Sequence, residues 1–527
     1  MTCSGAWVLE DQCSHGGSAL SGLPSGSPVL LLEDVPYLSH YPHHWQKLVL
    51  LISAQRHFAA ELRNRGFEVI YHKMCVDPIS VVRNFIQRFG VTHLQIMEPN
   101  DYPRAAALRR FNLPCELVVT GNNLFLNSNL QFADYAKGKK HLIMEFFYRQ
   151  MRTKLGVLLD DHGAPVGGAW NFDKDNRIGK IPPLLNLPAP YQPEMDAITR
   201  DAFADVSRCF EGKYFGRMPK QPDGEFIWPV THEQAAAQLE HFLQFRLAHF
   251  GHYEDAMTLR SWSIFHSHLS PAMNCGLLHP AFIVERIQAI AQQPRVPIPL
   301  NSLEGFTRQI IGWREFVRGV YWHEMTDGHE VAYTQRNELR ANHPLPEFYW
   351  SGQTEMVCMR ESLNPVIQYG YSHHISRLMV LANFALLHGI NPQAVNEWFT
   401  YAYADGYEWV TTPNVIGMAL YADGGIVATK PYAASGAYIN RMSDYCDQCP
   451  YDPTVSSGAK ACPFTRAYWP FIARHTKRLA ANPRTSLAIR GLKRLHATDI
   501  ERRGVETERW LVGLPIYKPQ DKTEHTR

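Results

Sequence analysis

The chain has 527 residues, of which 45% are hydrophobic and 12% aromatic, and its formal net charge is only +2. This length allows two or three domains around a large core, while the near-neutral charge means that any affinity for nucleic acid must come from a local patch. No apolar run approaches the roughly 20 residues of a membrane span, and the N-terminus lacks the pattern of a secretory signal. The ten cysteines are scattered apart from a C-terminal trio and do not indicate a disulfide framework. We therefore expect a cytoplasmic protein with no membrane anchor.

The N-terminal half alternates short apolar runs with amphipathic helices. Its first 27 residues are rich in Gly, Ser and Pro, which predicts a disordered extension over 1–27. Four strands are expected after it, at 28–34, 67–73, 91–99 and 115–120. This alternation predicts a parallel, Rossmann-like α/β domain over 28–135. GxGxxG does not follow the first strand, but a crevice at its end could hold a small ligand and would be faced by Glu33.

The second half is expected to be helical. A stretch rich in Pro and Gly predicts a helical and irregular linker over 136–230. Beyond it strand patterns nearly vanish and helical periodicity recurs, which predicts an all-α domain over 231–505 and a tail over 506–527. The fold class is thus an α/β N-terminal domain joined to a large all-α domain.

One helix of that domain combines an apolar surface with buried charge. It is expected from His373 to His388, with Gly389 at its C-terminal stop. It is apolar nearly all round, as buried helices are, yet its first turns contain two histidines and Arg377. A buried guanidinium needs a carboxylate or an anionic ligand beside it. Asp405 is the nearest candidate, and a structural ion pair is the simplest interpretation.

Cysteine spacing gives the strongest chemical signal. Cys446, Cys449 and Cys462 form C-x2-C-x12-C, a pattern typical of a shared metal in a cytosolic protein. Cys358 is the candidate for a fourth ligand. Spacing alone leaves structural zinc and an iron–sulfur cluster open, because both accept four cysteines. Proline after Cys449 and after Cys462 favours the cluster.

The segment FHSHLSPAMNCGLLHP, residues 265–280, is a candidate anion site. His266, Ser267 and Ser270 stand where a loop meets a helix, before apolar residues. Hydroxyls and free backbone N–H groups at such a place suit a phosphate. An ordinary capping motif would have a similar sequence.

The segment RQIIGWREFVRGVYW, residues 308–322, mixes charge with aromatic rings at helical spacing. A salt-bridged helix surface would explain Arg308, Glu315 and Arg318. It would not explain the interleaved rings of Trp313 and Phe316.

The segment Lys460–Leu495 is a local basic patch with nine Lys or Arg and no acidic residue. Aromatic residues interleave with these charges, among them Phe464, Tyr468, Trp469 and Phe471. Such a patch suits a nucleic-acid backbone, although a solvated helix surface is an equal alternative.

Together these motifs resemble the cryptochrome/photolyase family, and most closely its iron–sulfur bacterial branch, which contains prokaryotic (6-4) photolyases. The resemblance extends from about residue 28 to about residue 503. It rests on the four cysteines and on five sequence elements, which are S-x-LSP at 267–271, WREF-x-R at 313–318, HHISRLM at 373–379, the ADG turn at Asp405, and PNVIGM at 413–418.

The resemblance implies an α/β antenna domain and an all-α domain that binds FAD. The residues implied to lie along the FAD phosphates are Ser267, Leu269 and Ser270, with His266 and Tyr253 nearby. Those implied to line the flavin–adenine cavity are Gln309, Trp313, Glu315 and Arg318. Those implied to surround the isoalloxazine are His374, Arg377, Asp405 and Asn414, and the Arg377–Asp405 pair would then favour an anionic reduced ring.

The implied reaction is light-driven repair of UV-damaged DNA by a monomeric enzyme. A (6-4) photoproduct is flipped out of the duplex into the pocket above FAD, and photoexcited reduced flavin donates an electron to it. Transfer of the hydroxyl or amino group also needs a proton donor. His373 and His374 are implied to be that general acid, with His374 nearer the flavin.

The remaining assignments also follow from the resemblance. Trp398 and Trp350, with Tyr438 as a further candidate, would carry electrons from solvent to the flavin. Cys358, Cys446, Cys449 and Cys462 would bind a [4Fe–4S] cluster. An antenna pigment, 6,7-dimethyl-8-ribityllumazine, would lie at the α/β crevice near Glu33.

Two other functions fit parts of the sequence. A cryptochrome-like blue-light photoreceptor would use the same cofactors without repair, and it needs neither the basic patch nor the paired histidines. A zinc-bearing nucleic-acid-binding protein without flavin would explain the cysteines and the patch. It would leave WREF-x-R and HHISRLM without a purpose.

Overall fold

The computed structural model describes residues 3–139, 141–292, 298–326 and 331–517. Its N-terminal part contains a parallel five-stranded sheet in the order β3-β2-β1-β4-β5. The strands are β1 (Ser4–Val8), β2 (Pro28–Asp34), β3 (Glu68–Cys75), β4 (His93–Met97) and β5 (Glu116–Thr120). The four strands expected from the sequence are confirmed as β2 to β5.

Strand β2 shows why this sheet is buried on both faces. Successive side chains of a strand point to opposite faces, so Val29 and Leu31 join the large core that includes α2 (Trp45–Asn64). Leu30 and Leu32 join a second core with α3 (Pro78–Phe89). An uninterrupted apolar run suits a central parallel strand because both of its faces are covered.

The disordered extension expected over 1–27 is wrong. Strand β1 lies within it, at the centre of the sheet, and pairs with β2 on one side and β4 on the other. Its glycine is needed for packing, because a Cβ on Gly5 would lie 3.0 Å from the carbonyl oxygen of Pro28. A five-residue strand rich in small residues has little local signal, and its pairing with distant strands stabilises it.

Further helices belong to the first half of the chain. They are α1 (Val35–Leu38), α4 (Tyr102–Leu108), α5 (Asn129–Ala136), α6 (Met144–Leu155) and α7 (Ala197–Cys209). Helices α5 and α6 pack against residues 308–324 of the second half. Between α6 and α7 the chain is largely irregular. Helix α7 packs against α2.

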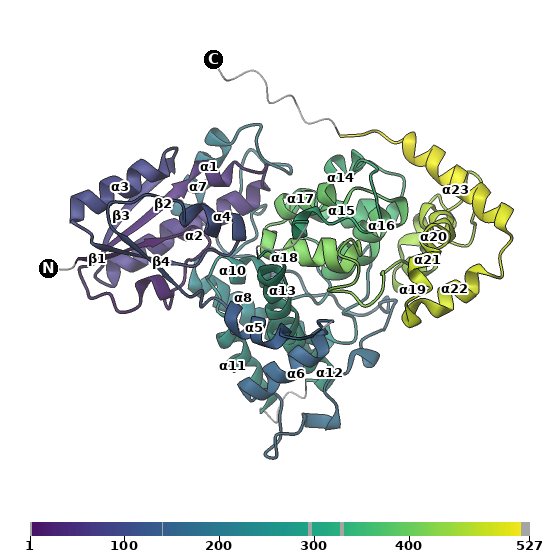
Figure 1. Cartoon of the computed structure of the whole chain (residues 1–527), viewed down its shortest axis with the longest axis horizontal. Coiled ribbons are helices and arrows are strands. Elements are labelled where there is room, and N and C mark those ends of the chain that lie inside the picture. Colours follow the sequence, from purple (N-terminus) through teal and green to yellow (C-terminus); the bar gives the residue numbers. More distant parts are fainter. Residues whose placement is uncertain (1–2, 140, 293–297, 327–330, 518–527) are drawn as a thin grey trace.

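The second half is helical, as expected. Its helices are α8 (His232–Phe245), α9 (Leu247–Phe250), α10 (Ser270–Asn274), α11 (Pro280–Ala291), α12 (Leu300–Thr307), α13 (Glu315–Glu324), α14 (Phe348–Ser351), α15 (Val357–Tyr369), α16 (Asn383–His388), α17 (Pro392–Ala402), α18 (Glu408–Thr412), α19 (Gly436–Met442), α20 (Pro463–Arg474), α21 (Thr476–Leu479), α22 (Ser486–Leu492) and α23 (Ala497–Val512). Figure 1 shows α13 and α18 near the middle of the molecule, with the sheet on one side and α20 to α23 on the other. Among the described residues, none of the helices combines the length and apolar character needed to cross a bilayer.

Candidate functional site

Three π-helical segments coincide with three of the sequence motifs. They are Arg308–Arg314, Ser376–Ala382 and Pro413–Ala419. The second contacts the third, and it continues into α16, which ends at Gly389 with φ 65° as the sequence predicted. Because a π-helical turn inserts a residue and is frequent at functional sites, these segments mark the candidate site.

Arg377 and Asp405 form the buried ion pair that the sequence predicted. Nη1 and Nη2 of Arg377 each lie 3.0 Å from a carboxylate oxygen of Asp405, and Nε donates to the carbonyl of Ser372 at 2.6 Å. The guanidinium also lies over the ring of Tyr403, 4.1 Å from its centroid. Ser270 donates to Asp405 at 2.6 Å, so the pair connects the start of α10 to the π-helical segment.

Asp405→Asn should destabilise the protein by about 3 kcal/mol, because it leaves the partly buried guanidinium of Arg377 without its counter-charge. With an unfolding entropy of about 2.1 cal/mol/K per residue, this corresponds to a Tm lower by roughly 3 °C. Differential scanning calorimetry checks it. The control is Glu240→Gln, which breaks an exposed bidentate pair with Arg286 and should change stability by less than about 1 kcal/mol. Equal Tm values for the two variants would contradict the role of the pair.

Two histidines precede Arg377 and differ in exposure. His373 is 3% exposed and stacks on His266 with ring centroids 4.6 Å apart, and its Nε2 lies 3.2 Å from Oγ of Ser376. Burial and the neighbouring charges lower the pKa of His373 to about 3. His374 is exposed. Desolvation by the protein around its ring and the charge of Arg377 lower its pKa to about 4.

The loop before α10 has a strained backbone. Ile264 and His268 adopt φ of 45° and 58°, a region that non-glycine residues seldom occupy. Arg246 holds the loop by donating to the carbonyls of Ile264 and His266 at 3.1 and 3.0 Å. Strain of this kind persists only where the surroundings enforce it, and it clusters at ligand sites.

The other residues assigned to the flavin have protein contacts in this region. Tyr253, Ser267, Gln309, Trp313 and Asn414 are partly buried, and Leu269 is buried. Nε2 of Gln309 donates to Glu254 at 2.7 Å, and Nδ2 of Asn414 donates to the carbonyl of Val410 at 2.7 Å. These contacts leave their assignment a prediction.

Glu315 and Arg318 contact the N-terminal part of the chain. Glu315 accepts the backbone N–H of Asn127 at 3.0 Å, and Arg318 donates to the side chain of Asn129 at 2.6 Å and approaches Glu98 at 3.5 Å. Both side chains are buried. They therefore join α13 to the segment before α5, and their place in a flavin–adenine cavity stays a prediction.

Trp398 and Trp350 lie in one aromatic region. Trp398 is fully buried and donates to the carbonyl of Tyr349 at 3.2 Å. Its ring centroid lies 5.7 Å from that of Tyr403, which in turn contacts Arg377. Trp350 follows Tyr349, is partly exposed and stacks on Tyr517 at 3.9 Å. The rings thus extend from a partly exposed position toward the ion pair.

Tyr438 lies elsewhere. It is on α19, where the guanidinium of Arg441 lies 5.4 Å from its ring centroid. Among the described residues, its ring makes no aromatic contact with Trp398 or Trp350. Its part in electron transfer stays a prediction without support from this arrangement.

The four predicted cysteines converge. Cys358, Cys446, Cys449 and Cys462 line one small cavity together with Gly436, and all are free thiols. A Cβ on Gly436 would lie 2.7 Å from Sγ of Cys462. In the described part of the chain, no three of these sulfurs lie within 4.8 Å of one another.

The basic patch is exposed, with one exception. Eight of its charged residues are exposed, namely Lys460, Arg474, Lys477, Arg478, Arg484, Arg490, Lys493 and Arg494, while Arg466 is buried. The aromatic residues of the patch differ in burial. Phe464 and Phe471 belong to the core, whereas Tyr468 and Trp469 are partly buried. The charges lie on α20, α21, α22 and the loops around them.

A cavity of about 300 Å³ lies between the end of α16 and the basic patch. Arg340, His343, Arg474 and His475 are among the residues that line it. None of the residues assigned to flavin, lesion or cluster is in its lining, so it is not the candidate site.

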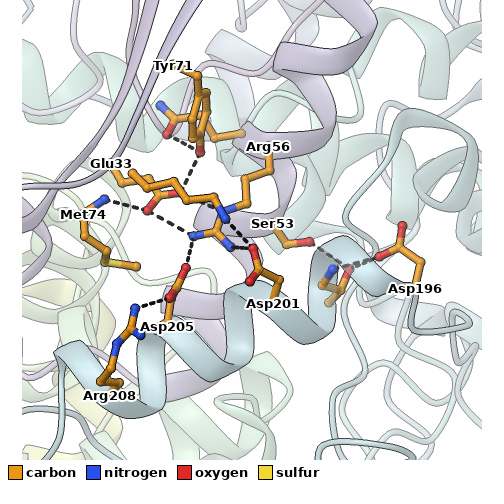
Figure 2. A network of polar contacts seen from close by, with 12 residues as sticks. Glu33, Ser53, Arg56, Tyr71, Met74, Asp196, Asp201, Asp205 and Arg208 are labelled. Carbon is orange, nitrogen blue, oxygen red and sulfur yellow. Dashed lines mark hydrogen bonds and ion pairs between the residues drawn. The ribbon is translucent and has the colours of Figure 1, made fainter.

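The crevice expected at Glu33 is closed around its carboxylate. Glu33 is fully buried, and both oxygens are occupied: Arg56 donates at 2.7 and 3.2 Å, Tyr71 at 2.8 Å and the backbone of Met74 at 2.9 Å. Figure 2 shows this network, which continues from Arg56 to two aspartates of α7. The expectation that Glu33 faces an open crevice is wrong, because it is the counter-charge of a buried arginine.

Three residues of the site were not found from the sequence. Arg246 holds the strained loop, Tyr403 lies between Trp398 and Arg377, and Asn274 donates to the carbonyl of Asp405 at 2.9 Å. The sequence contained a signal for Arg246 only, because an arginine in the apolar segment RLAHF indicates a buried charge that needs partners. Tyr403 and Asn274 could not be recognised, because their roles depend on tertiary contacts.

Comparisons with known proteins identify relatives of this chain and structures that share its fold. A family model described as deoxyribodipyrimidine photo-lyase-related protein matches residues 6–221. A protein of Agrobacterium fabrum named (6-4) photolyase is 40% identical over 486 residues, covering 90% of this chain and 93% of the relative. A bacterial class III photolyase from Agrobacterium tumefaciens superposes with a TM-score of 0.57 at 15% identity, covering 98% of this chain and 94% of the other. A cryptochrome of Synechocystis superposes with a TM-score of 0.54 at 13% identity, covering 96% and 94%. The two structures share the fold of this chain.

Proposed function

The chain belongs to the cryptochrome/photolyase family, and we propose that it is a (6-4) photolyase, which reverses (6-4) photoproducts in DNA with blue light. The observation that carries this function is the 40% identity, over 90% of the chain, to a relative named (6-4) photolyase. An exposed histidine, His374, close in sequence to the Arg377–Asp405 ion pair supports it, because the reaction needs an acid near the lesion.

FAD is the cofactor that the family implies, and the residues of the site fit it. Within the described residues, Nε2 of His266 and Nδ1 of His373 are buried without a hydrogen-bond partner, as expected where a polar ligand completes a site. The strained loop up to Ser270 would bind the phosphates, and Arg377 and Asp405 would adjoin the ring. Bound reduced FAD, excited by light, supplies the electron that starts repair.

His374 is the proton donor of the proposed reaction, and His373 is its positioning residue. His374 is exposed, so a flipped-out base can reach it. His373 is enclosed between His266 and Ser376, which fixes the start of the π-helical segment. The lesion receives its proton from a ring nitrogen of His374 while Arg377 stays paired with Asp405.

The four cysteines fit a [4Fe–4S] cluster better than a zinc ion. Tetrahedral zinc with Zn–S bonds of about 2.3 Å would hold all of its sulfurs about 3.8 Å apart, whereas no three of these sulfurs lie within 4.8 Å of one another among the described residues. Sulfurs that are not all so close together suit a cluster of several irons. The cluster would anchor α20, which begins directly after Cys462 and leads into the basic patch.

Electrons for the flavin would enter at Trp350 and pass through Trp398, with Tyr403 between Trp398 and the ion pair. Trp398→Phe should largely abolish photoreduction of oxidised flavin, because phenylalanine is hard to oxidise, and should leave repair by chemically reduced protein intact. Flavin absorbance under blue light measures the first and product recovery the second. The control is Trp45→Phe, which alters a fully buried tryptophan outside this route. Unchanged photoreduction in Trp398→Phe would exclude the route.

The proposed photolyase function also implies what the enzyme binds. Damaged DNA would bind across the exposed basic patch through its phosphates, with the lesion flipped out toward His374. A ribityllumazine antenna stays a proposal, and the closed surroundings of Glu33 give it no support.

The compartment that we propose is the cytoplasm. The ten cysteines are free thiols, which suits a reducing compartment. We also propose that the enzyme is a monomer.

A cryptochrome-like photoreceptor is the second candidate, because a cryptochrome shares this fold. Reduced protein with an oligonucleotide carrying one (6-4) photoproduct, in blue light and in darkness, decides between them. We expect light-dependent recovery of the undamaged bases, and no recovery with a cyclobutane dimer in the same sequence. Flavin photochemistry without recovery of the (6-4) substrate would favour the photoreceptor.

A further inference from the structure

A cluster of possible metal ligands lies outside the proposed repair site. It consists of His15, Glu61 and His232, whose side chains bring Nε2, Oε2 and Nδ1 within 4.8 Å of one another. Nε2 of His15 lies 2.5 Å from Oε2 of Glu61, and Nδ1 of His232 lies 3.1 Å from the same oxygen. The repair reaction uses none of these groups.

The three side chains come from segments far apart in the sequence, and the backbone of each is held by the fold. His15 lies in the loop after β1, where Arg65 donates to its carbonyl at 3.1 Å. Glu61 is in the last turn of α2, and His232 is the first residue of α8. The two imidazole rings stack with centroids 3.8 Å apart, and Phe58 packs against both at 5.8 and 5.9 Å.

The arrangement suits a divalent transition metal. Two imidazole nitrogens and one carboxylate oxygen are a ligand set that zinc takes, and tetrahedral bonds of about 2.0–2.2 Å separate neighbouring ligands by about 3.3 Å. The distance from His232 to Glu61 is already close to this value, and that from His15 must open by less than about 1 Å. The two ring planes are only 20° apart, so the ring of His15 must also turn for both nitrogens to point at one ion. Its side chain is 46% exposed, so the ring can turn and water can reach a fourth position. The guanidinium of Arg65 donates to the backbone carbonyl of His15, and Glu61 supplies the negative charge that a metal ion needs.

We propose that His15, Glu61 and His232 bind a divalent transition-metal ion of the zinc type. Each neutral ring binds the ion through the nitrogen that faces Glu61 and carries its hydrogen on the other ring nitrogen, and the ion is released when protons bind the ligating nitrogens. Its ligands tie the loop after β1 to α2 and to α8. The site therefore fastens the segment that supplies the central strand of the sheet to the helical half of the chain.

Titration of the flavin- and iron-loaded protein with Zn²⁺ tests the site. Isothermal calorimetry, after treatment with a chelator and with iron content measured beforehand, should show one equivalent bound. His15→Ala should lower the affinity of that equivalent by more than about 100-fold, because even loss of an outer-shell partner costs 10–100-fold. His72→Ala, which alters an exposed histidine of β3, should bind as the wild type does.

Thermal unfolding provides a second measurement that does not depend on the calorimetric model. Zn²⁺ should raise the Tm of the wild type and of His72→Ala, since a ligand that binds the folded state stabilises it. It should not raise the Tm of His15→Ala or of Glu61→Gln. Zinc binding that is unchanged by His15→Ala, or the lack of any bound equivalent in the wild type, would overturn the proposal.

Discussion

His374→Ala is expected to lower the rate of light-driven (6-4) repair by about 10²- to 10⁴-fold, the usual contribution of a positioned general acid. Binding of damaged DNA and the FAD content should stay close to those of the wild type, because the ring is exposed and not part of the core. Single-turnover repair in blue light, a DNA-binding assay and the flavin spectrum measure the three quantities. Replacement of the exposed His72 by alanine serves as the control.

The comparison with His373 makes this test specific. His373 is enclosed by His266 and Ser376, so His373→Ala removes packing and should also reduce FAD binding and stability. His374→Ala should affect repair alone. If His374→Ala repaired at the wild-type rate, another group would have to donate the proton.

The pH dependence of repair follows from the pKa of His374, which burial and the charge of Arg377 lower to about 4. At neutral pH only about one ring in a thousand is protonated at this pKa. The negative charge of bound DNA would raise this pKa. A donor must carry its proton, so the rate should fall as pH rises above the raised value. Repair measured between about pH 6 and 9 should show this fall, and a flat profile would contradict His374 as the acid.

Much of the fold could be predicted because its signals are local. Strands β2 to β5 are short apolar runs bounded by turns, and the helical half has clear periodicity. Arg377 could be paired with Asp405 because a buried guanidinium requires a counter-charge. The cysteines could be grouped because three of them are close in sequence.

What the sequence could not show depends on tertiary contacts. Strand β1 is stable through its pairing with β2 and β4, and its small residues are indistinguishable from those of a flexible tail. Glu33 ends a strand like many ligand-facing acids, but Arg56 comes from the following helix and occupies it. The π-helical segments leave no pattern that differs from an ordinary helix.

The residues of the WREF-x-R motif show why a sequence motif alone does not assign ligand-binding side chains. Glu315 and Arg318 are buried and charged, as functional residues often are, yet their observed partners are Asn127, Asn129 and Glu98. A helix has several faces, and a sequence motif does not say which of them faces the ligand. Only the contacts of each side chain separate positions that bind from positions that join the two halves of the chain.

Cys449→Ala is expected to have the second large effect, loss of the cluster. Iron should fall from about four atoms per chain to nearly none, since three thiolates cannot complete the site. Cys462 directly precedes α20, and α20 packs against α16, α22 and α23. Without the cluster this packing loses its anchor, so the soluble yield should fall and damaged DNA should bind less tightly. Iron analysis, the visible spectrum and a DNA-binding assay measure these changes.

Cys209→Ala is the matched control, because Cys209 is also a partly buried free thiol but lies at the end of α7, far from the four cysteines in the sequence. It should keep its iron, yield and DNA affinity. Metal analysis of Cys449→Ala also distinguishes the two metals. If the four cysteines bound structural zinc, the wild type would contain zinc and no iron, and the variant would lose the zinc. A Cys449→Ala protein that is stable, free of iron and unchanged in DNA binding would show that the cluster does not support the basic helices.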